Sequence, residues 1–260
     1  MFGFGRDRDS EVLLIACMGQ VFSWDGRRTE HVGGSGYASC LAECAGELYE
    51  GGIGAIRKFS STRNPHVGKK LADVESCVAL CTHEGALIHA TNGAPDKPLY
   101  EIRETMSGNL LAERDNEINA MTVHNGVLCD GGEYGVCETN SGRRLYQDPC
   151  SALASLSGSL YAASRGAIYD VLSGTEVFSV FTFSDCDPDF TMRSISSLCS
   201  HKGRLLAALP GASSSWIVDA LGHSICVDWA QAYSKVRGRS CDAEITTMVS
   251  IKSSVLTNAL

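Results

Sequence analysis

Six polar residues stand at corresponding places along this chain, each shortly ahead of a segment of small and apolar residues. They are Glu75, Asn116, Glu117, Asp148, Arg193 and Glu244. Carboxylate and amide oxygens are the ligands that hard divalent cations such as Ca²⁺ prefer. If the four carboxylates converge, they could hold Ca²⁺ or Mg²⁺, which would polarise a carbonyl group or a water molecule. The alternative is a group of solvated acids that cap strand ends.

Histidine, another frequent metal ligand, also recurs at one place. His83, His124 and His201 each stand two residues before a recurring glycine, but the same place holds Cys44 and Leu156 in other copies. A ligand set would not alternate with leucine. We therefore expect turn histidines that hydrogen-bond to the backbone.

The chain has twelve cysteines, which we expect to act as small buried hydrophobic residues. Cys77 and Cys150 take a place that isoleucine takes in other copies of the repeat. Cys40 and Cys44 would lie about 13 Å apart on a strand, which is unlike the spacing of a zinc-binding pair. A chain of this size that lacks a secretion signal needs no disulfide framework.

The elements that must position these residues come from a repeat. A Gly-x-Leu phrase recurs roughly every 40 residues, which is typical of repeat architectures. It begins at Gly46, Gly85, Gly126, Gly158 and Gly203. Each copy carries short alternating runs and turn residues, so the repeat unit is predicted to be a small antiparallel sheet, the blade of a β-propeller.

A slim apolar segment precedes each Gly-x-Leu phrase. It contains a small residue followed by a larger apolar one, and a copy without the glycine occurs near the C-terminus. The pairs are Cys40 and Leu41, Ala79 and Leu80, Ala120 and Met121, Ala152 and Leu153, Ser197 and Leu198, and Thr247 and Met248. Because blades converge at the centre of a ring, this pattern predicts the innermost strand of each blade.

The two ends of the chain complement each other. Residues 13–16, 21–26 and 29–32 match the three outer strands of a blade that lacks its inner strand, and residues 245–249 supply one. The sequence therefore predicts an all-β fold with a single domain over residues 1–260. This domain is a six-bladed β-propeller closed by pairing of the C-terminal and N-terminal strands. Residues 254–257 also resemble a strand, which leaves a seventh, partial blade as the alternative.

The combined pattern resembles the β-propeller repeats of the WD-repeat, quinoprotein and related superfamilies. The inner strand and the Gly-x-Leu phrase carry this resemblance, together with strands such as Ile168, Tyr169 and Asp170 that lead into a turn ending at Gly174. The resemblance covers nearly the whole chain. The Trp-Asp and Gly-His dipeptides of WD repeats and the recurring Gly-Gly of kelch repeats do not occur in register. The resemblance therefore implies an architecture only, and no family's functional residues can be assigned to this chain.

Composition excludes several classes of function. The formal net charge of −8 opposes binding to nucleic acid or to anionic membranes, since both require a basic surface. The apolar stretch over residues 12–18 is too short for a signal sequence or a membrane span. We therefore expect a cytoplasmic monomer.

No nucleophile elbow, zinc-binding helix, phosphate loop or cofactor fingerprint occurs in the sequence. The leading hypothesis is a non-enzymatic interaction or scaffold module that binds a protein and needs no cofactor. The alternative is a hydrolase or lyase that acts on a small polar substrate at the mouth of the central channel. That enzyme would use Ca²⁺ or Mg²⁺ held by Glu75, Glu117, Asp148 and Glu244. In either case the residues expected to bind a ligand at the channel mouth are Glu75, Asn116, Glu117, Asp148, Arg193 and Glu244. A basic run from Arg57 to Lys70 could contact an acidic partner or could be merely solvated.

Overall fold

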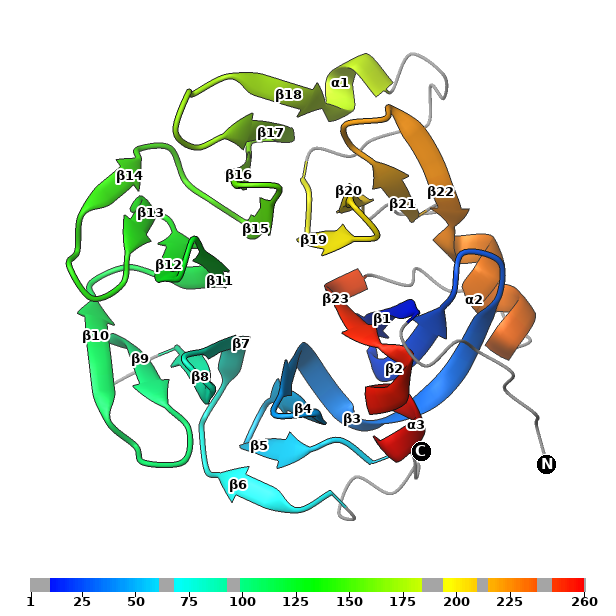
Figure 1. Ribbon diagram of the computed structural model, residues 1–260, viewed down its shortest axis with the longest axis horizontal. Coiled ribbons are helices and arrows are strands. Elements are labelled where there is room, and N and C mark those ends of the chain that lie inside the picture. Colours follow the sequence, from blue (N-terminus) through cyan, green and yellow to red (C-terminus); the bar gives the residue numbers. More distant parts are fainter. Residues whose placement is uncertain are drawn as a thin grey trace.

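The computed structural model describes residues 10–60, 68–92, 99–183, 194–209, 215–237 and 245–259. Within these ranges the chain forms antiparallel sheets arranged as a ring (Figure 1). The predicted all-β propeller fold is confirmed.

Four sheets contain four antiparallel strands each. In each of these sheets the first strand in the chain is the innermost, and the following strands lie successively further from the centre of the ring. The first contains β7 (Cys77–His83), β8 (Ala86–Thr91), β9 (Tyr100–Glu104) and β10 (Leu110–Arg114). The second contains β11 (Ile118–His124), β12 (Val127–Gly132), β13 (Gly135–Glu138) and β14 (Arg144–Tyr146). The third contains β15 (Ala152–Leu156), β16 (Ser159–Ser164), β17 (Ala167–Asp170) and β18 (Glu176–Ser179). The fourth contains β19 (Ser197–His201), β20 (Arg204–Leu209), β21 (Trp216–Asp219) and β22 (Ser224–Asp228).

The remaining sheet has seven strands, in the order β23, β1, β2, β3, β4, β5, β6. Their bounds are β1 (Glu11–Cys17), β2 (Gly19–Trp24), β3 (Thr29–Cys44), β4 (Glu47–Gly52), β5 (Ala55–Lys58), β6 (Lys70–Ala72) and β23 (Ile245–Lys252). The long strand β3 joins two blades, because residues 29–33 pair with β2 and residues 38–44 pair with β4. The described strands thus group into six four-stranded units. This grouping agrees with the predicted six blades, and the blade number of the whole chain stays a prediction.

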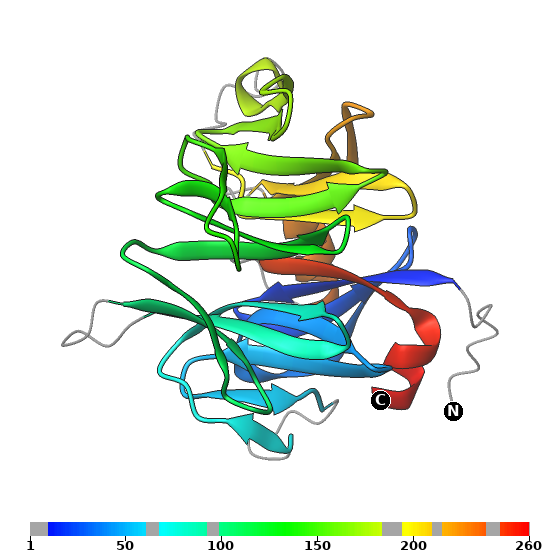
Figure 2. The same ribbon diagram turned by 60° about the vertical axis from the view of Figure 1, so that its left-hand side comes forward.

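The ring is closed by the two ends of the chain. Strand β23 pairs with β1 in antiparallel register, from Glu11 opposite Lys252 to Cys17 opposite Ile245. The two strands lie side by side in both ribbon views (Figures 1 and 2). The predicted pairing of the C-terminal and N-terminal strands is therefore present.

The recurring glycine has a conformational cause. In the turn between β15 and β16, Ser157 has φ 51° and Gly158 has φ 84°. Two consecutive residues with positive φ form the type I′ turn of a two-residue β-hairpin, and glycine adopts this conformation without steric cost. In every other copy of the Gly-x-Leu phrase, the glycine and the residue before it also have positive φ.

The hydrophobic core lies between neighbouring sheets, and three described helices lie outside the blades. They are α1 (Val180–Phe183), α2 (Trp229–Arg237) and α3 (Ser253–Ala259). Helix α2 buries Trp229 and Tyr233 against the ring of Phe22, with centroid separations of 5.3 and 5.4 Å. This helix lies between β22 and β23 in the chain.

The strand expected over residues 254–257 is wrong, because this segment lies in α3. A further strand would have to pair with β23, but β1 already occupies that position. The segment instead turns into a helix and buries Val255 and Leu256 in the cluster that contains Val12 and Leu48. It therefore covers the junction between two blades.

Candidate functional site

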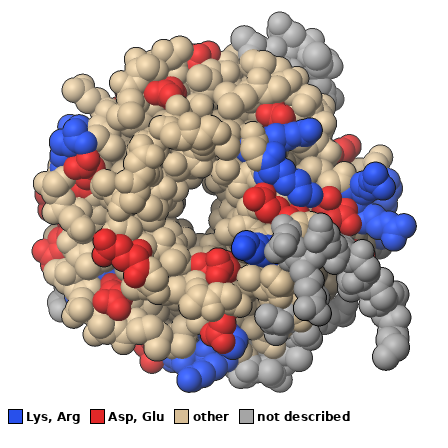
Figure 3. Space-filling model, viewed as in Figure 1, with Lys and Arg blue, Asp and Glu red and all other residues tan. Residues whose placement is uncertain are grey.

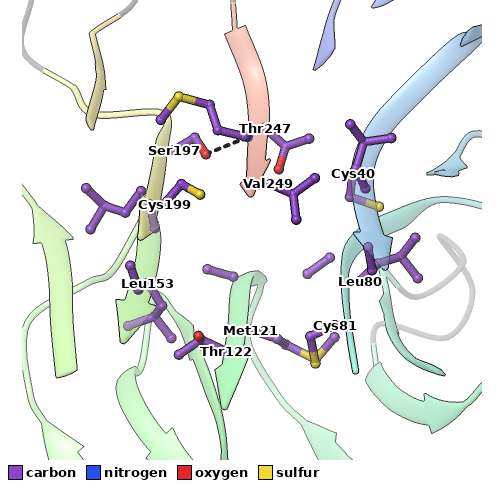
Figure 4. A pocket seen from close by; sticks show the side chains of 18 of the residues that line it. Cys40, Leu80, Cys81, Met121, Thr122, Leu153, Ser197, Cys199, Thr247 and Val249 are labelled. Carbon is purple, nitrogen blue, oxygen red and sulfur yellow. Dashed lines mark hydrogen bonds between the residues drawn. The ribbon is translucent and has the colours of Figure 1, made fainter. Parts of the chain in front are cut away.

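A cavity of about 340 Å³ lies at the centre of the ring, where the space-filling view shows an opening (Figure 3). Inner segments of β3, β7, β11, β15, β19 and β23 line it. The small and apolar residues predicted for the inner strands are all in this lining, and Figure 4 shows several of them facing one another. The prediction that these segments form the innermost strands is confirmed.

The described lining of the central cavity carries hydroxyl, thiol, amide and apolar groups, and its one charged residue is Glu43. Burial raises the pKa of the Cys81 and Cys199 thiols to about 12. Both thiols are therefore protonated at neutral pH, and a protonated thiol is a poor nucleophile. The Ser197 hydroxyl accepts a hydrogen bond of 3.0 Å from the backbone N–H of Met248 (Figure 4). The two protonated thiols and the Ser197 hydroxyl therefore do not form a catalytic pair.

A recurring hydrogen bond joins neighbouring inner strands around the cavity. A polar side chain one position before the small residue donates to a backbone carbonyl of the next blade. The bonds run from Ser39 to Cys77 (2.8 Å), from Asn119 to Cys150 (3.1 Å), from Ser151 to Ile195 (2.8 Å) and from Ser196 to Ile245 (2.7 Å). Val78 holds this position in β7 and has no donor to offer. The polar groups at this end of the cavity therefore tie blade to blade.

Four of the six residues predicted at the channel mouth are described, and Arg193 and Glu244 lie outside the described ranges. Glu75, Asn116 and Asp148 are exposed and Glu117 is half-buried, each shortly before an inner strand as expected. None of the four lines the central cavity. Asp148 Oδ1 instead lies 3.6 Å from Nη2 of Arg165.

The structure does not test the four-carboxylate metal set, because it includes Glu244. Among the described residues, no three His, Cys, Asp or Glu side chains are grouped so that they could hold a metal ion. Binding of Ca²⁺ or Mg²⁺ by Glu75, Glu117, Asp148 and Glu244 stays a prediction.

The recurring histidines each contact the next blade. His83 Nε2 lies 3.0 Å from the carbonyl oxygen of Gly126, so the prediction of a backbone partner is right there. It is wrong for His124 and His201, whose Nδ1 atoms lie 3.1 and 2.9 Å from the hydroxyls of Ser155 and Ser250. In both cases the partner of the imidazole ring is a serine side chain on the adjacent inner strand and not a backbone group.

No disulfide joins any two of the ten described cysteines, and eight of them are buried, as expected for small hydrophobic residues. Two lysines of the basic run form ion pairs within the protein. Lys58 Nζ lies 2.6 Å from Glu47 Oε1, and Lys70 pairs with Asp73. The middle of that run, residues 61–67, lies outside the described ranges.

A second cavity, of about 110 Å³, was not anticipated from the sequence. It lies where β3, β4 and β5 meet, and its lining consists of Ser35, Tyr37, Glu50, Gly51, Gly52, Ile53, Gly54, Ala55 and Arg57. Glu50 lines this cavity and is only 4% exposed. Tyr37 and Ile53, in contrast, are 60% and 73% exposed beside it.

Opposing effects act on the ionisation of Glu50. Burial raises the pKa of its carboxyl group above the usual value, and the hydrogen bonds from Ser35 and the charge of Arg57 offset only part of this increase. The backbone N–H of Ser35 donates to Glu50 Oε2 at 3.2 Å. The second cavity also adjoins the predicted channel-mouth face, because the N–H of Gly54 donates to the carbonyl oxygen of Glu75 at 3.1 Å.

Another blade contains a buried carboxylate with a complete set of partners. Asp130 in β12 is 0% exposed and receives two hydrogen bonds from Arg114, Nε to Oδ2 at 2.8 Å and Nη2 to Oδ1 at 2.7 Å. The Thr139 hydroxyl donates to Oδ1 at 2.7 Å, and the Tyr134 hydroxyl donates to Oδ2. A signal for both sites exists in the sequence, where an acidic residue followed by Gly-Gly occurs at residues 50–52 and 130–132.

Comparison with known proteins supports the fold and no particular family. No family model matches the sequence, and no curated protein matches it. The solved structures that resemble it include the WD40 β-propeller domain of Doa1, at 13% identity and a TM-score of 0.51 over 85% of this chain and 82% of that one. A chain of a nidogen/laminin complex is 12% identical, with a TM-score of 0.62 over 93% and 98% of the two chains. A protein of unknown function from Bacteroides caccae is 14% identical, with a TM-score of 0.56 over 94% and 99%.

These likenesses and the ring of sheets define the protein as a β-propeller protein. At such identities they show the fold alone. A search of the described helices for a membrane-spanning segment finds none of sufficient length and hydrophobicity.

Proposed function

We propose that this propeller is a non-enzymatic interaction module, and that it binds a protein partner through the face that carries Tyr37, Ile53 and the cavity around Glu50. The observation that carries this proposal is an exposed aromatic and an exposed aliphatic side chain beside a cavity that contains a buried carboxylate. Aromatic residues are enriched at interfaces, and the residues that dominate binding cluster around desolvated pockets.

Two further observations support this function. One of the similar propeller structures was solved as a complex between nidogen and laminin, and for this chain that is an analogy of fold. The described lining of the central cavity contains no acid–base pair, and its Cys81 and Cys199 thiols are held protonated by burial. Binding by the surface accounts for these features better than chemistry in the channel.

The test is affinity capture with the whole protein and matched surface variants. Ile53→Asp places a charge beside the cavity, and Leu172→Asp makes the same change at an exposed residue in the turn after β17. We expect wild type and Leu172→Asp to recover the same partner and Ile53→Asp to lose it, with equal melting temperatures for all three. Recovery by Ile53→Asp would assign the interaction to another face. Failure of wild type to recover any specific protein would overturn the proposal.

Thermal melts separate this function from the metal-dependent alternative. A ligand that binds only the native state raises the unfolding temperature by mass action. The interaction module predicts that melts with millimolar Ca²⁺ or Mg²⁺ superimpose on melts with a chelator. An increase that Glu117→Gln removes would instead support the metal-dependent hydrolase or lyase.

A further inference from the structure

The same backbone framework surrounds Glu50 and Asp130. Residues 38–58 correspond one to one with residues 118–138, because the strand registers match throughout this range. Glu50 lies opposite Leu41, just as Asp130 lies opposite Met121. A Gly-Gly pair follows each of these acidic residues. A Cβ atom at Gly52 would lie 1.8 Å from the backbone oxygen of Tyr37, and a Cβ atom at Gly132 would lie 1.8 Å from that of Glu117, so only glycine fits at either position.

In the blade that contains Asp130, the chain itself supplies the cation. Arg114 forms two hydrogen bonds with the Asp130 carboxylate and lies 5.7 Å from the centroid of the Tyr134 ring. A guanidinium group matches a carboxylate in this way because its two N–H groups are parallel and coplanar. Stacking on an aromatic ring adds to this attraction.

In the blade that contains Glu50, the corresponding side chains are missing. At the same sequence distances from the carboxylate at which Arg114, Tyr134 and Thr139 stand in the other blade, this blade has Gly34, Gly54 and Phe59. These are two glycines and a side chain that cannot donate a hydrogen bond. A cavity of about 110 Å³ lies beside the carboxylate, several times the ~30 Å³ that a water molecule occupies in the liquid. Among the described residues, no Lys, Arg or His side chain forms an ion pair with Glu50.

We propose that the Glu50 cavity binds the guanidinium group of an arginine side chain that a protein partner inserts between Tyr37 and Ile53. This inference rests on the proposed interaction function and specifies the chemistry of the partner. The incoming guanidinium group would take the role that Arg114 has at Asp130. Tyr37, exposed beside the cavity, would provide the aromatic surface that Tyr134 provides in the other blade.

Two neighbours affect the ionisation of Glu50. The hydrogen bonds from Ser35 and the charge of Arg57 offset part of the increase that burial causes in the pKa of Glu50, which stays above its usual value. An incoming guanidinium group would lower this pKa and favour the ionised carboxylate, because an opposite charge stabilises the charged form. Arg57 lines the cavity without forming an ion pair with Glu50, so the carboxylate keeps its capacity for a second cation.

The test is a titration of the whole ¹⁵N-labelled protein with short peptides, observed through the backbone amides of residues 50–57. The probes are acetyl-Gly-Arg-Gly-amide, its lysine counterpart and its citrulline counterpart, which has the shape of arginine without the charge. We expect the arginine peptide to shift these amides, the lysine peptide to bind about tenfold more weakly, and the citrulline peptide to cause no shift.

Variants connect the binding to the carboxylate. Glu50→Gln should weaken binding of the arginine peptide by at least about tenfold, since the charge-assisted pair is lost. Glu47→Gln removes an exposed carboxylate from the same strand and should leave binding unchanged. Tyr37→Ala changes an exposed residue. It should weaken binding several-fold, and it provides a second measurement if Glu50→Gln fails to fold.

The outcomes separate this inference from the function on which it rests. It is overturned if the arginine peptide leaves residues 50–57 unshifted or binds Glu50→Gln as tightly as wild type. If capture recovers a partner that Ile53→Asp loses while no peptide binds, the interaction function stands and the arginine inference falls. Agmatine, the free guanidinium probe, should bind more weakly than the peptide. If it binds more tightly, the cavity serves a small guanidinium compound and the protein source of the arginine is wrong.

Discussion

Arg114, the last residue of β10, donates two hydrogen bonds to Asp130 in β12, so the outermost strand of one blade is tied to the second strand of the next. The aspartate is fully buried and the arginine side chain is largely so. Removal of one partner from such a buried pair is strongly destabilising, because an uncompensated charge is then left in the interior.

Removal of the arginine should therefore destabilise the whole ring. We expect Arg114→Met, which keeps most of the apolar stem, to lower the free energy of unfolding by about 3–5 kcal/mol. Urea denaturation followed by circular dichroism measures this change. The double variant Arg114→Met with Asp130→Leu should recover a large part of the loss, because no buried charge remains.

Arg143→Met is the matched control for this pair. Arg143 pairs with Glu138 at the surface, where solvent screens the interaction, so the variant should unfold at the same urea concentration as wild type. A loss for Arg143→Met as large as that for Arg114→Met would show that burial does not determine the effect.

The hydrogen bonds between inner strands lead to a second prediction. Ser196→Ala leaves the carbonyl of Ile245 without its partner at 2.7 Å and should lower the free energy of unfolding by about 1 kcal/mol. Val78→Thr places a hydroxyl group where β7 lacks one and should restore the pattern with the carbonyl of Ile118. Urea midpoints should fall for the first variant and rise or stay for the second. An equal fall for both would mean that packing, and not the hydrogen bond, determines stability at this position.

The sequence predicts the blades well because their causes are local. Each type I′ turn needs a residue with positive φ, so glycine recurs at Gly126, Gly158 and Gly203. Each inner strand must be slim and apolar, so residues such as Ala152 and Leu153 recur before that turn. The helix α3 was missed because its residues favour a strand locally, and only the pairing of β23 with β1 removes the position that such a strand would take.

The Glu50 cavity could not be predicted in the same way, since it is defined by side chains that are absent. Arg114 and Asp130 belong to different blades, so their pairing becomes visible only when the register between strands is known. Comparison of the two copies then shows that Gly34 stands at the same sequence distance from Glu50 as Arg114 does from Asp130. The acids of the predicted channel mouth, in contrast, share a residue type and a place before the inner strands, and the described ones do not line a common cavity.

Closure of the ring by β23 predicts that the end of the chain is essential for stability. Deletion of residues 245–260 removes the inner strand that pairs with β1, and we expect the protein to lose its cooperative unfolding transition. Deletion of residues 253–260 keeps β23 and removes α3 with its buried Val255 and Leu256, so this variant should unfold cooperatively at a lower temperature. Circular dichroism melts measure both. A truncation at residue 244 that kept the wild-type melting temperature would contradict the closure.

The buried imidazole of His89 gives stability a dependence on pH. Its Nδ1 lies 3.0 Å from the hydroxyl of Thr105, and burial, with a smaller effect of the charge of Arg103 and against that of Glu101, lowers its pKa from 6.5 to about 4. The unfolded chain therefore binds a proton at a higher pH than the folded protein does. The contribution of His89 is fully present above pH 6.5 and is lost as pH falls from 6.5 to about 4.

The variant His89→Gln isolates this contribution, because glutamine can still hydrogen-bond with Thr105 but does not titrate. Wild type should lose about 3 kcal/mol more of its free energy of unfolding than His89→Gln between pH 7 and pH 4, as measured by urea denaturation at several pH values. His83→Gln changes a less buried histidine and should retain the full wild-type loss. Parallel curves for wild type and His89→Gln would show that the folded protein accommodates a charged imidazole at this position, contrary to its burial beside Thr105.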